Sequence, residues 1–318
     1  MIHSDPGLDS PMMLDVDTGV DDALAIALAI QMGASIVGIS SVAGNVPIDL
    51  ATRNTQRVVS WMKAESIPVH RGASRPLVAD YHDAAHVHGE NGLGGADLGD
   101  GAGPESDAGA VEALLHNASA FDGELVLVAL GPLTNVAMAM NLRPGFARHV
   151  RRLVIMSGAF GVPGNVTPHA EFNAFADPDA CAQVMKAEWN EIVVVGLDVT
   201  HQTAITRDQW ERLPGDATGA AELVRMVTGR TFTERNMDGF YLHDPLAVAV
   251  ALHPDLVELA ARTVTVSVDA EYRGKTTMRG VGNVHTATAV DSARFAKLFA
   301  DRMAIPVSQV PPVKSRSE

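Results

Sequence analysis

The chain has 318 residues, of which 47% are hydrophobic and 19% are charged, so it is long enough to bury one large α/β core. Acidic residues outnumber basic ones by 38 to 24, and the net charge of −14 argues against a surface that holds nucleic acid or an anionic membrane. Cys181 is the only cysteine, which rules out an internal disulfide and a structural zinc site built from thiolates. Because the net charge is acidic, we expect a neutral or cationic small-molecule ligand.

The single cysteine, together with the lack of a signal-peptide pattern and of a membrane-span pattern, predicts a cytoplasmic location. Residues 1–11 carry no basic start and no long apolar run, so secretion is not expected. No later stretch reaches the roughly 18 uninterrupted apolar residues of a membrane-spanning helix. We expect one domain over residues 1–318, with its core at about 12–305 and mobile tails at 1–10 and 307–318.

Apolar runs alternate with helical patterns along the chain, in the order typical of a mostly parallel sheet wrapped by helices. Strands are predicted at residues 12–16, 35–42, 124–130, 152–156 and 191–197. Helices are predicted at residues 21–32 and 47–63, from 133, after the Asp-Pro pairs at 177 and 244, and at 292–303. Residues 263–268 and 283–290 resemble a pair of edge strands. The predicted fold is therefore an open, mostly parallel, Rossmann-like α/β sheet with a small antiparallel element near the C-terminus.

Residues 71–104 are rich in Gly and His, show little periodicity and are longer than an ordinary connection between elements. Such a segment is typical of a functional loop. His88 lies within it, and recognition of a planar base is the specific hypothesis for this residue. A solvent-exposed loop histidine is the simpler alternative.

The most informative pattern is an acidic run, in which four aspartates fall within residues 15–22 between a predicted strand and a predicted helix. Two carboxylates about 4 Å apart repel by roughly 4 kcal/mol at an effective dielectric near 20. No Lys or Arg lies between Met1 and Arg53 to offset this repulsion. Because side chains alternate along a strand, Asp15 and Asp17 point to the same face. The run therefore predicts a hard divalent cation with oxygen ligands at the end of the strand.

Two other motifs share features with this run. Phosphatases of the haloacid dehalogenase type also begin with an apolar strand and Asp-x-Asp, and use the first Asp as a nucleophile. Here, two further acids would place negative charge where a phosphate must enter. An EF-hand loop is excluded, because it needs Gly at its sixth position and Glu at its twelfth, where this chain has Val20 and Ile26.

Further candidate residues lie later in the chain. His243 and Asp244 precede a proline; Asp244 is either a helix N-cap or a metal ligand, and His243 is a candidate proton donor. Glu171 and Asn173 bracket Phe172 in a polar loop, a combination that suits the hydroxyl groups of a sugar, although an ordinary surface loop would read similarly.

Two strand ends add candidates of their own. Asn45 follows the second predicted strand and has the same ambiguity as the polar loop. Leu130 ends a strand before the segment Gly-Pro-Leu-Thr-Asn, and its backbone carbonyl is a candidate hard-metal ligand whatever its side chain.

Taken together, these segments resemble the inosine-uridine preferring nucleoside hydrolase family from about residue 12 to about 295. The resemblance is carried by the acidic signature at residues 15–22, Asn45, and the segments at 131–135, 164–173 and 243–247, which occur in the family's order. It implies hydrolysis of the N-glycosidic bond of ribonucleosides to free base and ribose. Relatives are commonly dimers or tetramers, so a homodimer or homotetramer is the expected assembly.

Carried over residue by residue, the resemblance implies a Ca²⁺ ion bound by Asp17, Asp22, Asp244 and the carbonyl of Leu130. It implies ribose contacts from Asp21, Asn45, Asn165, Glu171 and Asn173, with Asn165 near the 5′ side. Asp15 is expected to support the metal acids from behind. His88 and Phe172 are expected on the base side.

The chemistry of the bond divides the remaining roles. Departure of the base leaves a ribosyl cation-like transition state, so a water must be activated and the base made a better leaving group. We expect Asp17 to take the water's proton and His243 to protonate the base. Pyrimidine-preferring relatives carry Tyr and Gln where this chain has Thr231, Phe232 and Arg235, so the base preference stays open. Ser157 stands where relatives tend to have Gly.

Two rival functions remain at the level of sequence. One is the Asp-x-Asp phosphatase; against it, this chain has no convincing Lys after a later strand and does have the segment Glu171-Phe172-Asn173. The other is a non-catalytic Ca²⁺-dependent protein that binds a nucleoside or ribose. Such a protein would keep Asp17, Asp22 and Asp244 but would not need His243 as an acid.

Overall fold

A central eight-stranded sheet organises the computed structural model, which describes residues 9–101 and 105–306. The strand order is β3-β2-β1-β4-β5-β6-β10-β9. The bounds are β1 Met12–Val16, β2 Ile36–Ser41, β3 Val69–His70, β4 Leu125–Ala129, β5 Val150–Met156, β6 Ile192–Val195, β9 Val257–Val266 and β10 Thr276–Val290. All neighbouring pairs are parallel except β9 and β10. The predicted mostly parallel α/β sheet is confirmed. The predicted tails, apart from residues 9 and 10, lie outside the described residues.

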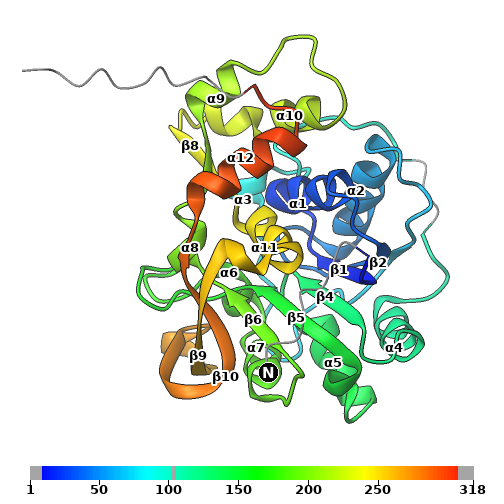
Figure 1. The fold of residues 1–318 in the computed structure, drawn as a ribbon, viewed down its shortest axis with the longest axis vertical. Helices are drawn as coiled ribbons and strands as arrows, with labels where there is room; N and C mark the ends of the chain where they lie inside the picture. Colours follow the sequence, from blue (N-terminus) through cyan, green and yellow to red (C-terminus); the bar gives the residue numbers. More distant parts are fainter. Residues whose placement is uncertain (1–8, 102–104, 307–318) are drawn as a thin grey trace, which may run out of the picture.

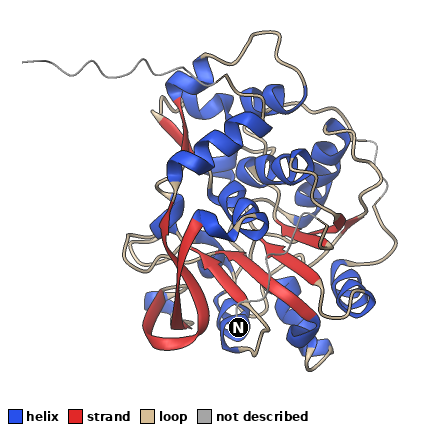
Figure 2. Ribbon diagram, viewed as in Figure 1, coloured by secondary structure: helices blue, strands red, loops and turns tan. Residues whose placement is uncertain are grey.

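Helices cover both faces of the sheet (Figures 1 and 2). One face carries α1 Val20–Gln31, α2 Ile48–Trp61, α10 Gly219–Thr233, α11 His243–Leu252 and α12 Ser292–Arg302. The other carries α4 Ala110–Ala120, α5 Thr134–Leu142 and α7 Pro178–Lys186. Helix α1 is apolar around most of its circumference and packs against α2, α10, α11 and α12, so it lies in the core rather than at the surface. No helix in the described ranges is long and apolar enough to cross a lipid bilayer.

Strand β1 lies at the point where the strand order reverses. The chain passes from β1 to β2 and β3 on one side, and β4 then pairs with the other side of β1. All five residues of β1 are buried, and Met13 packs into a different core cluster from Leu14 and Val16. In an open parallel sheet, a crevice forms at the carboxyl ends of the strands at such a reversal. The acidic run therefore starts where this fold class binds its ligands.

Shorter elements complete the fold. They are α3 Ala85–His88, α6 Phe172–Ala176, α8 Leu197–Thr200, α9 Arg207–Glu211, β7 Ala204–Thr206, β8 Gly239–Tyr241 and the 3-10 turns Phe146–His149, Pro254–Leu256 and Ala270–Tyr272. Strands β7 and β8 form a separate two-stranded antiparallel sheet that the sequence did not indicate, because three-residue strands leave too little periodicity.

Three expectations need correction. Of the two strands expected at an edge near the C-terminus, β9 is an edge strand but β10 is not, because β10 also pairs with β6 inside the sheet. Strand β6 ends at Val195, and Leu197 begins α8 instead of ending the strand. Asp244 is not an N-cap: α11 begins one residue earlier at His243, with Leu242 in the cap position. A proline is tolerated in a first helical turn because the backbone N–H groups there have no partner within the helix.

Candidate active site

The turn between β1 and α1 is held together by Asp22. Its carboxylate accepts hydrogen bonds from the backbone N–H groups of Gly19 at 2.9 Å and Asp17 at 3.1 Å. These donors belong to the turn and the start of the helix, where N–H groups lack partners and the helix dipole favours a negative charge. The Asp22 carboxylate therefore stabilises the turn between β1 and α1, which brings the aspartates on either side of it together.

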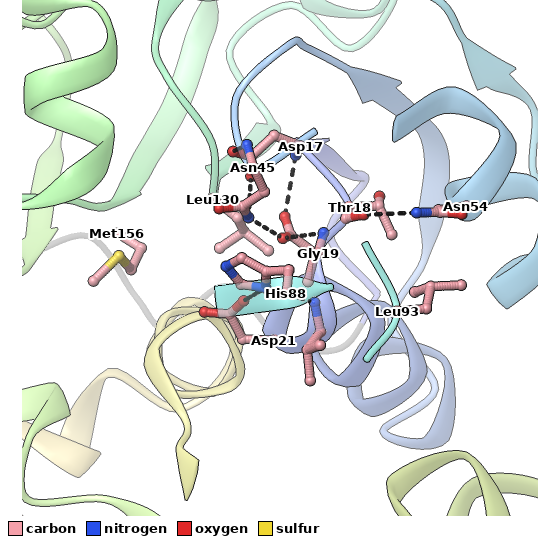
Figure 3. Close-up of polar contacts among 12 residues, drawn as sticks. Asp17, Thr18, Gly19, Asp21, Asn45, Asn54, His88, Leu93, Leu130 and Met156 are labelled. Atoms are coloured by element: carbon pink, nitrogen blue, oxygen red, sulfur yellow. Dashed lines mark hydrogen bonds and ion pairs between the residues drawn. The ribbon is translucent and has the colours of Figure 1, made fainter. Parts of the chain in front are cut away.

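Asn45 links two of the aspartates (Figure 3). Its side-chain amide donates to the Asp17 carboxylate and to the Asp22 carboxylate, each at 3.1 Å, and its backbone N–H donates to Asp17 Oδ2 at 2.7 Å. The preceding residue must be glycine on steric grounds, because a Cβ added to Gly44 would lie 2.0 Å from Asp17 Oδ2. The segment after β2 is thus fitted closely against the segment after β1.

Asp21, Asp22 and Asp244 form the group that could hold a metal ion: they offer carboxylate oxygens that all lie within 4.8 Å of one another. Because α11 begins at His243, Asp244 lies in its first turn, and α11 packs directly against α1, which carries the other two. The expected set contained Asp17 in place of Asp21. Asp17 adjoins this group through Asn45 but faces Asn45 and the turn.

Burial makes these charges costly. It raises the pKa of Asp21 and of Asp22 to about 6, and the pKa of Asp17 and of Asp244 well above the usual range, with the neighbouring carboxylates adding to the shift for Asp17, Asp22 and Asp244. Among the described residues, no Lys or Arg forms an ion pair with any of the four.

The donor set fits a hard cation. Asp21 Oδ1 is buried and lacks a hydrogen-bond partner, although His88 Nδ1 lies 3.8 Å away. A buried carboxylate oxygen without a donor is expensive, and a divalent cation with oxygen ligands would offset both this cost and the repulsion between the acids.

The carbonyl of Leu130 faces the same region. Its N–H donates to the carbonyl of Asp15 at 2.7 Å, which extends the pairing of β1 with β4 by one residue. Its own carbonyl accepts from the Asn173 side chain at 2.5 Å, and Asn173 also donates to Met156 O at 3.0 Å. The ends of β4 and β5 are therefore joined through one amide.

Asp15 is buried behind the cavity lining and bonds to the neighbouring strand and helix. Its carboxylate accepts from Ser40 at 2.5 Å and from the Asn135 amide at 2.8 Å, and the same amide donates to the Ser41 carbonyl at 2.9 Å. Burial raises the pKa of Asp15 to about 6, which these two donors partly oppose. The contacts hold the ends of β1 and β2 and the start of α5 in register.

Glu171 serves as the N-cap of α6. Its carboxylate accepts from the backbone N–H groups of Asn173 at 2.7 Å, Gly158 at 2.9 Å and Ala174 at 3.1 Å, and from the Ser157 hydroxyl at 3.0 Å. The serine at position 157 therefore adds a donor to a buried carboxylate. Burial raises the pKa of Glu171, and the four donors oppose that shift.

Two histidines also line the site. His88 Nδ1 accepts the backbone N–H of Val20 at 3.0 Å, at the start of α1, and burial lowers the pKa of His88 to about 4 (Figure 3). His243 Nδ1 lies 2.7 Å from the hydroxyl of Thr200, and burial lowers the pKa of His243 to about 3. Both imidazoles are therefore neutral at pH 7.

These residues surround a cavity of about 480 Å³. Most of the expected site residues line it: Asp21, Asn45, His88, Leu130, Asn165, Glu171, Phe172, Asn173, His243 and Asp244. Asp15, Asp17 and Asp22 are buried behind this lining, with exposures of 0%, 1% and 0%. Asn165 is solvent-exposed, and its side chain accepts the N–H of Phe172 at 2.9 Å.

The sequence reasoning missed part of the lining. Met156 ends β5, and its position at a parallel strand end could have indicated it. Val166, Met237 and Tyr241 form an exposed apolar rim, which became recognisable only once the structure placed these loop residues beside the cavity. The predicted functional loop at residues 71–104 supplies six lining residues, namely His82, Asp83, Ala84, His86, Val87 and His88.

Comparison with known proteins finds the same architecture and sequence pattern elsewhere. Residues 12–297 match the family described as inosine-uridine preferring nucleoside hydrolase. The non-specific ribonucleoside hydrolase RihC of Escherichia coli (strain SMS-3-5 / SECEC) is 36% identical over 305 residues, which cover 93% of this chain and 98% of the relative. A plant nucleoside hydrolase has a TM-score of 0.88 at 31% identity, covering 93% of this chain and 99% of its own. A purine-preferring ribonucleoside hydrolase from Gardnerella vaginalis has a TM-score of 0.86 at 31% identity, covering 92% and 98%.

Proposed function

The chain belongs to the inosine-uridine preferring nucleoside hydrolase family and is thus an N-glycosidase, and we propose that it hydrolyses ribonucleosides to ribose and free base with the help of Ca²⁺. Family membership over residues 12–297 decides against the phosphatase alternative. The observation that carries the proposal is the cluster of buried carboxylates beside the cavity, in which oxygens of Asp21, Asp22 and Asp244 lie within 4.8 Å of one another and Asn45 joins Asp17 to Asp22.

The cation would be held by the side chains of Asp17, Asp22 and Asp244 and by the carbonyl of Leu130. Ca²⁺ accepts six to eight oxygen ligands in flexible arrangements, which suits a mixed set of carboxylates and a backbone carbonyl. Bound there, the ion would supply positive charge that makes a nearby water a better nucleophile at neutral pH. The proximity of Asp21 to this group supports a ribose contact directly beside the ion.

The ribose would be held by five side chains, namely Asp21, Asn45, Asn165, Glu171 and Asn173. All five line the cavity. Asn45, Glu171 and Asn173 are fixed by hydrogen bonds to neighbouring strand and helix ends, so little ordering is needed when a sugar binds. Asp21 Oδ1 is buried without a partner, which supports its use as an acceptor for a ribose hydroxyl.

Two protons must move. Asp17 would take the proton of the attacking water, and its raised pKa favours a proton-accepting role near neutral pH. His243 would donate to the departing base from the cavity wall, with His88 and Phe172 beside the base. Because the His243 ring is neutral in the free protein, it would have to take up a proton from solvent once the substrate is bound, and the negative charge that develops on the base favours that charged form.

The direct test is release of free ribose from a panel of nucleosides, with and without a chelator and with Ca²⁺ restored. Ribose release that the chelator abolishes and Ca²⁺ restores supports the proposal. Nucleoside binding without ribose release would leave the non-catalytic Ca²⁺-dependent protein as the correct function.

His243 needs a test of its own, because a good leaving group does not require an acid. His243→Ala should slow hydrolysis of inosine by roughly 10²-fold to 10⁴-fold and that of an activated nitrophenyl riboside far less. Equal losses on the two substrates would remove His243 from the role of acid.

The setting of the enzyme is part of the same proposal. We expect a cytoplasmic enzyme that acts as a homodimer or homotetramer on small nucleosides and binds neither nucleic acid nor membrane. The acidic net charge of −14 supports the last point, and the family resemblance supports the assembly. Light scattering on the purified protein measures the assembly directly.

A further inference from the structure

We propose that Thr200 is a positioning residue whose hydroxyl orients the imidazole of His243 toward the departing base. The inference rests on the proposed role of His243. The hydroxyl oxygen of Thr200 lies 2.7 Å from Nδ1 of His243, and Thr200 is fully buried, with 0% exposure. The contact therefore lies behind the ring, on the side away from solvent.

The position of the hydroxyl is set by the short helix α8. The N–H of Leu197 donates to the Gly158 carbonyl at 2.9 Å, and the Asp198 carboxylate accepts the N–H groups of Phe160 at 2.9 Å and Gly161 at 2.6 Å. The start of α8 is thereby held against the segment that follows β5. Thr200 lies at the end of α8. The segment to which α8 is bound contains Gly158, whose N–H also donates to the Glu171 carboxylate.

The hydrogen bond determines which ring nitrogen of His243 is available to a substrate. Nδ1 is engaged by Thr200, which leaves Nε2 as the nitrogen for the cavity that His243 lines. Within residues 9–101 and 105–306, Nε2 of His243 has no hydrogen-bond partner. The atom is also not fully buried, because the buried polar atoms without a partner do not include it. A hydroxyl both donates and accepts, so Thr200 can satisfy Nδ1 whichever nitrogen carries the proton.

Other neighbours of the ring do not direct it. The rings of His201 and Tyr241 lie 5.7 Å and 5.6 Å from the His243 ring, centre to centre. Such contacts limit the space around the imidazole but allow several tilts, and Tyr241 is 45% exposed. Among the described residues, the Thr200 hydroxyl is the directional contact of this side chain.

The test replaces the hydroxyl without changing the shape. Thr200→Val should lower kcat for inosine by roughly tenfold to a hundredfold, the scale of a misplaced reacting group, while KM changes little. Hydrolysis of an activated nitrophenyl riboside, which does not need the acid, should change less than about threefold. Thr200→Ser, which restores the hydroxyl, should recover most of the inosine activity.

A matched control guards against a general effect of losing a buried hydroxyl. Thr228 is also fully buried, and its hydroxyl bonds only to the Val224 carbonyl of its own helix, at 2.6 Å. Thr228→Val should leave both substrates unaffected. A Thr200→Val protein that loses both activities equally, or whose inosine activity stays unchanged, would overturn the inference.

A double-mutant cycle separates this inference from the proposed role of His243. In a His243→Ala background, Thr200→Val should cause no further selective loss on inosine. If His243→Ala itself fails to discriminate between the two substrates, the acid assignment is wrong. If His243→Ala discriminates and Thr200→Val does not, the acid stands and the positioning role of Thr200 is wrong. Melting temperatures of all variants confirm that folded proteins are being compared.

Discussion

The acidic end of the cavity takes its residues from strand ends and first helical turns, whereas the rim around the base takes them from loops and short strands. Asp22 and Asp244 are 0% and 2% exposed, while Val166, Met237 and Tyr241 are 42% to 45% exposed. At the acidic end, the carboxylates of Asp17 and Asp22 are held by backbone N–H donors. Under the proposed mechanism, the residues that break the bond belong to the core of the fold, while the surface that would meet the base can vary without disturbing them.

Burial also acts in opposite directions on the two sides. It raises the pKa of the aspartates and lowers the pKa of His88 and His243, so both sides are driven toward neutrality. For the aspartates, a cation reverses this tendency. For the histidines, negative charge that arises on the departing base during the reaction would favour the protonated form. The charge state of the aspartates is therefore expected to depend on metal, and that of the two histidines on the nature of the leaving base.

The largest expected effect lies at the acidic end. Asp17→Asn keeps the shape of the side chain but removes its charge and its ability to accept a proton, so turnover should fall by roughly 10²-fold to 10⁴-fold on every nucleoside. Asp49→Asn is the control, since Asp49 is exposed and pairs only with Arg71. Retention of turnover within a few-fold in Asp17→Asn, measured as ribose release, would remove Asp17 as the base.

Gly44→Ala should come next, because it attacks the fit between two strand ends and not a functional group. The added Cβ would lie 2.0 Å from Asp17 Oδ2 and 2.8 Å from Pro132 Cδ, so the carboxylate must move. We expect a loss of about 10²-fold in kcat with a folded protein, consistent with a misplaced catalytic group. Gly109→Ala, whose Cβ meets only the Arg71 carbonyl at 3.6 Å, should behave as wild type. Unchanged kinetics in Gly44→Ala would show that this close packing does not matter to the chemistry.

Ca²⁺ should stabilise the protein in a pH-dependent manner. A carboxylate with a raised pKa is neutral below that pKa and charged above it. Of the proposed ligands, Asp22 has a pKa of about 6 and the pKa values of Asp17 and Asp244 are raised well above the usual range, so the stabilisation by Ca²⁺ should be present at pH 7.5 and be lost as the pH falls through about 6. At a free concentration a hundred times Kd, the ion contributes about 2.7 kcal/mol, which thermal melts resolve.

Asp244→Asn provides the variant for this measurement and should reduce the shift in Tm caused by Ca²⁺. Asp49→Asn should not alter it. A Ca²⁺-induced shift of equal size at pH 5 and pH 7.5, or one unaffected by Asp244→Asn, would contradict a site built from these carboxylates.

The smallest effect is expected at the rim. Arg235 is exposed and lines the cavity, so Arg235→Ala should change the ratio of kcat/KM between inosine and uridine by roughly tenfold or less, since exposed polar contacts contribute little. Arg279→Ala, an exposed arginine of β10 that does not line the cavity, should leave the ratio unchanged. A hundredfold loss of kcat/KM on both substrates would mean that Arg235 takes part in the reaction itself. It would contradict the distinction between the acidic core and the rim.

Much of the fold could be predicted because its elements are long and strongly patterned. The predicted strands at residues 12–16, 35–42 and 124–130 agree with β1, β2 and β4 to within one residue at each end. The helix at residues 47–63 differs from α2 by one residue at its start and two at its end, the usual uncertainty of helix boundaries. Strands β7 and β8 and the helices α3 and α8 escaped prediction because three or four residues carry no period.

The four aspartates at residues 15–22 called for a cation on their own account, because like charges so close in the chain stay close in any fold. The sequence determined that much, together with the alternation of strands and helices. It could not determine that Asp21 and Asp22 meet Asp244, that Asn45 joins Asp17 to Asp22, or that Thr200 touches His243. Those contacts join residues 23 to 223 positions apart, and they depend on the reversal of strand order beside β1 and on the packing of α11 against α1. The helix of Asp244 begins one residue earlier than its Asp-Pro pair suggested, so the carboxylate faces the other acids and does not cap the helix.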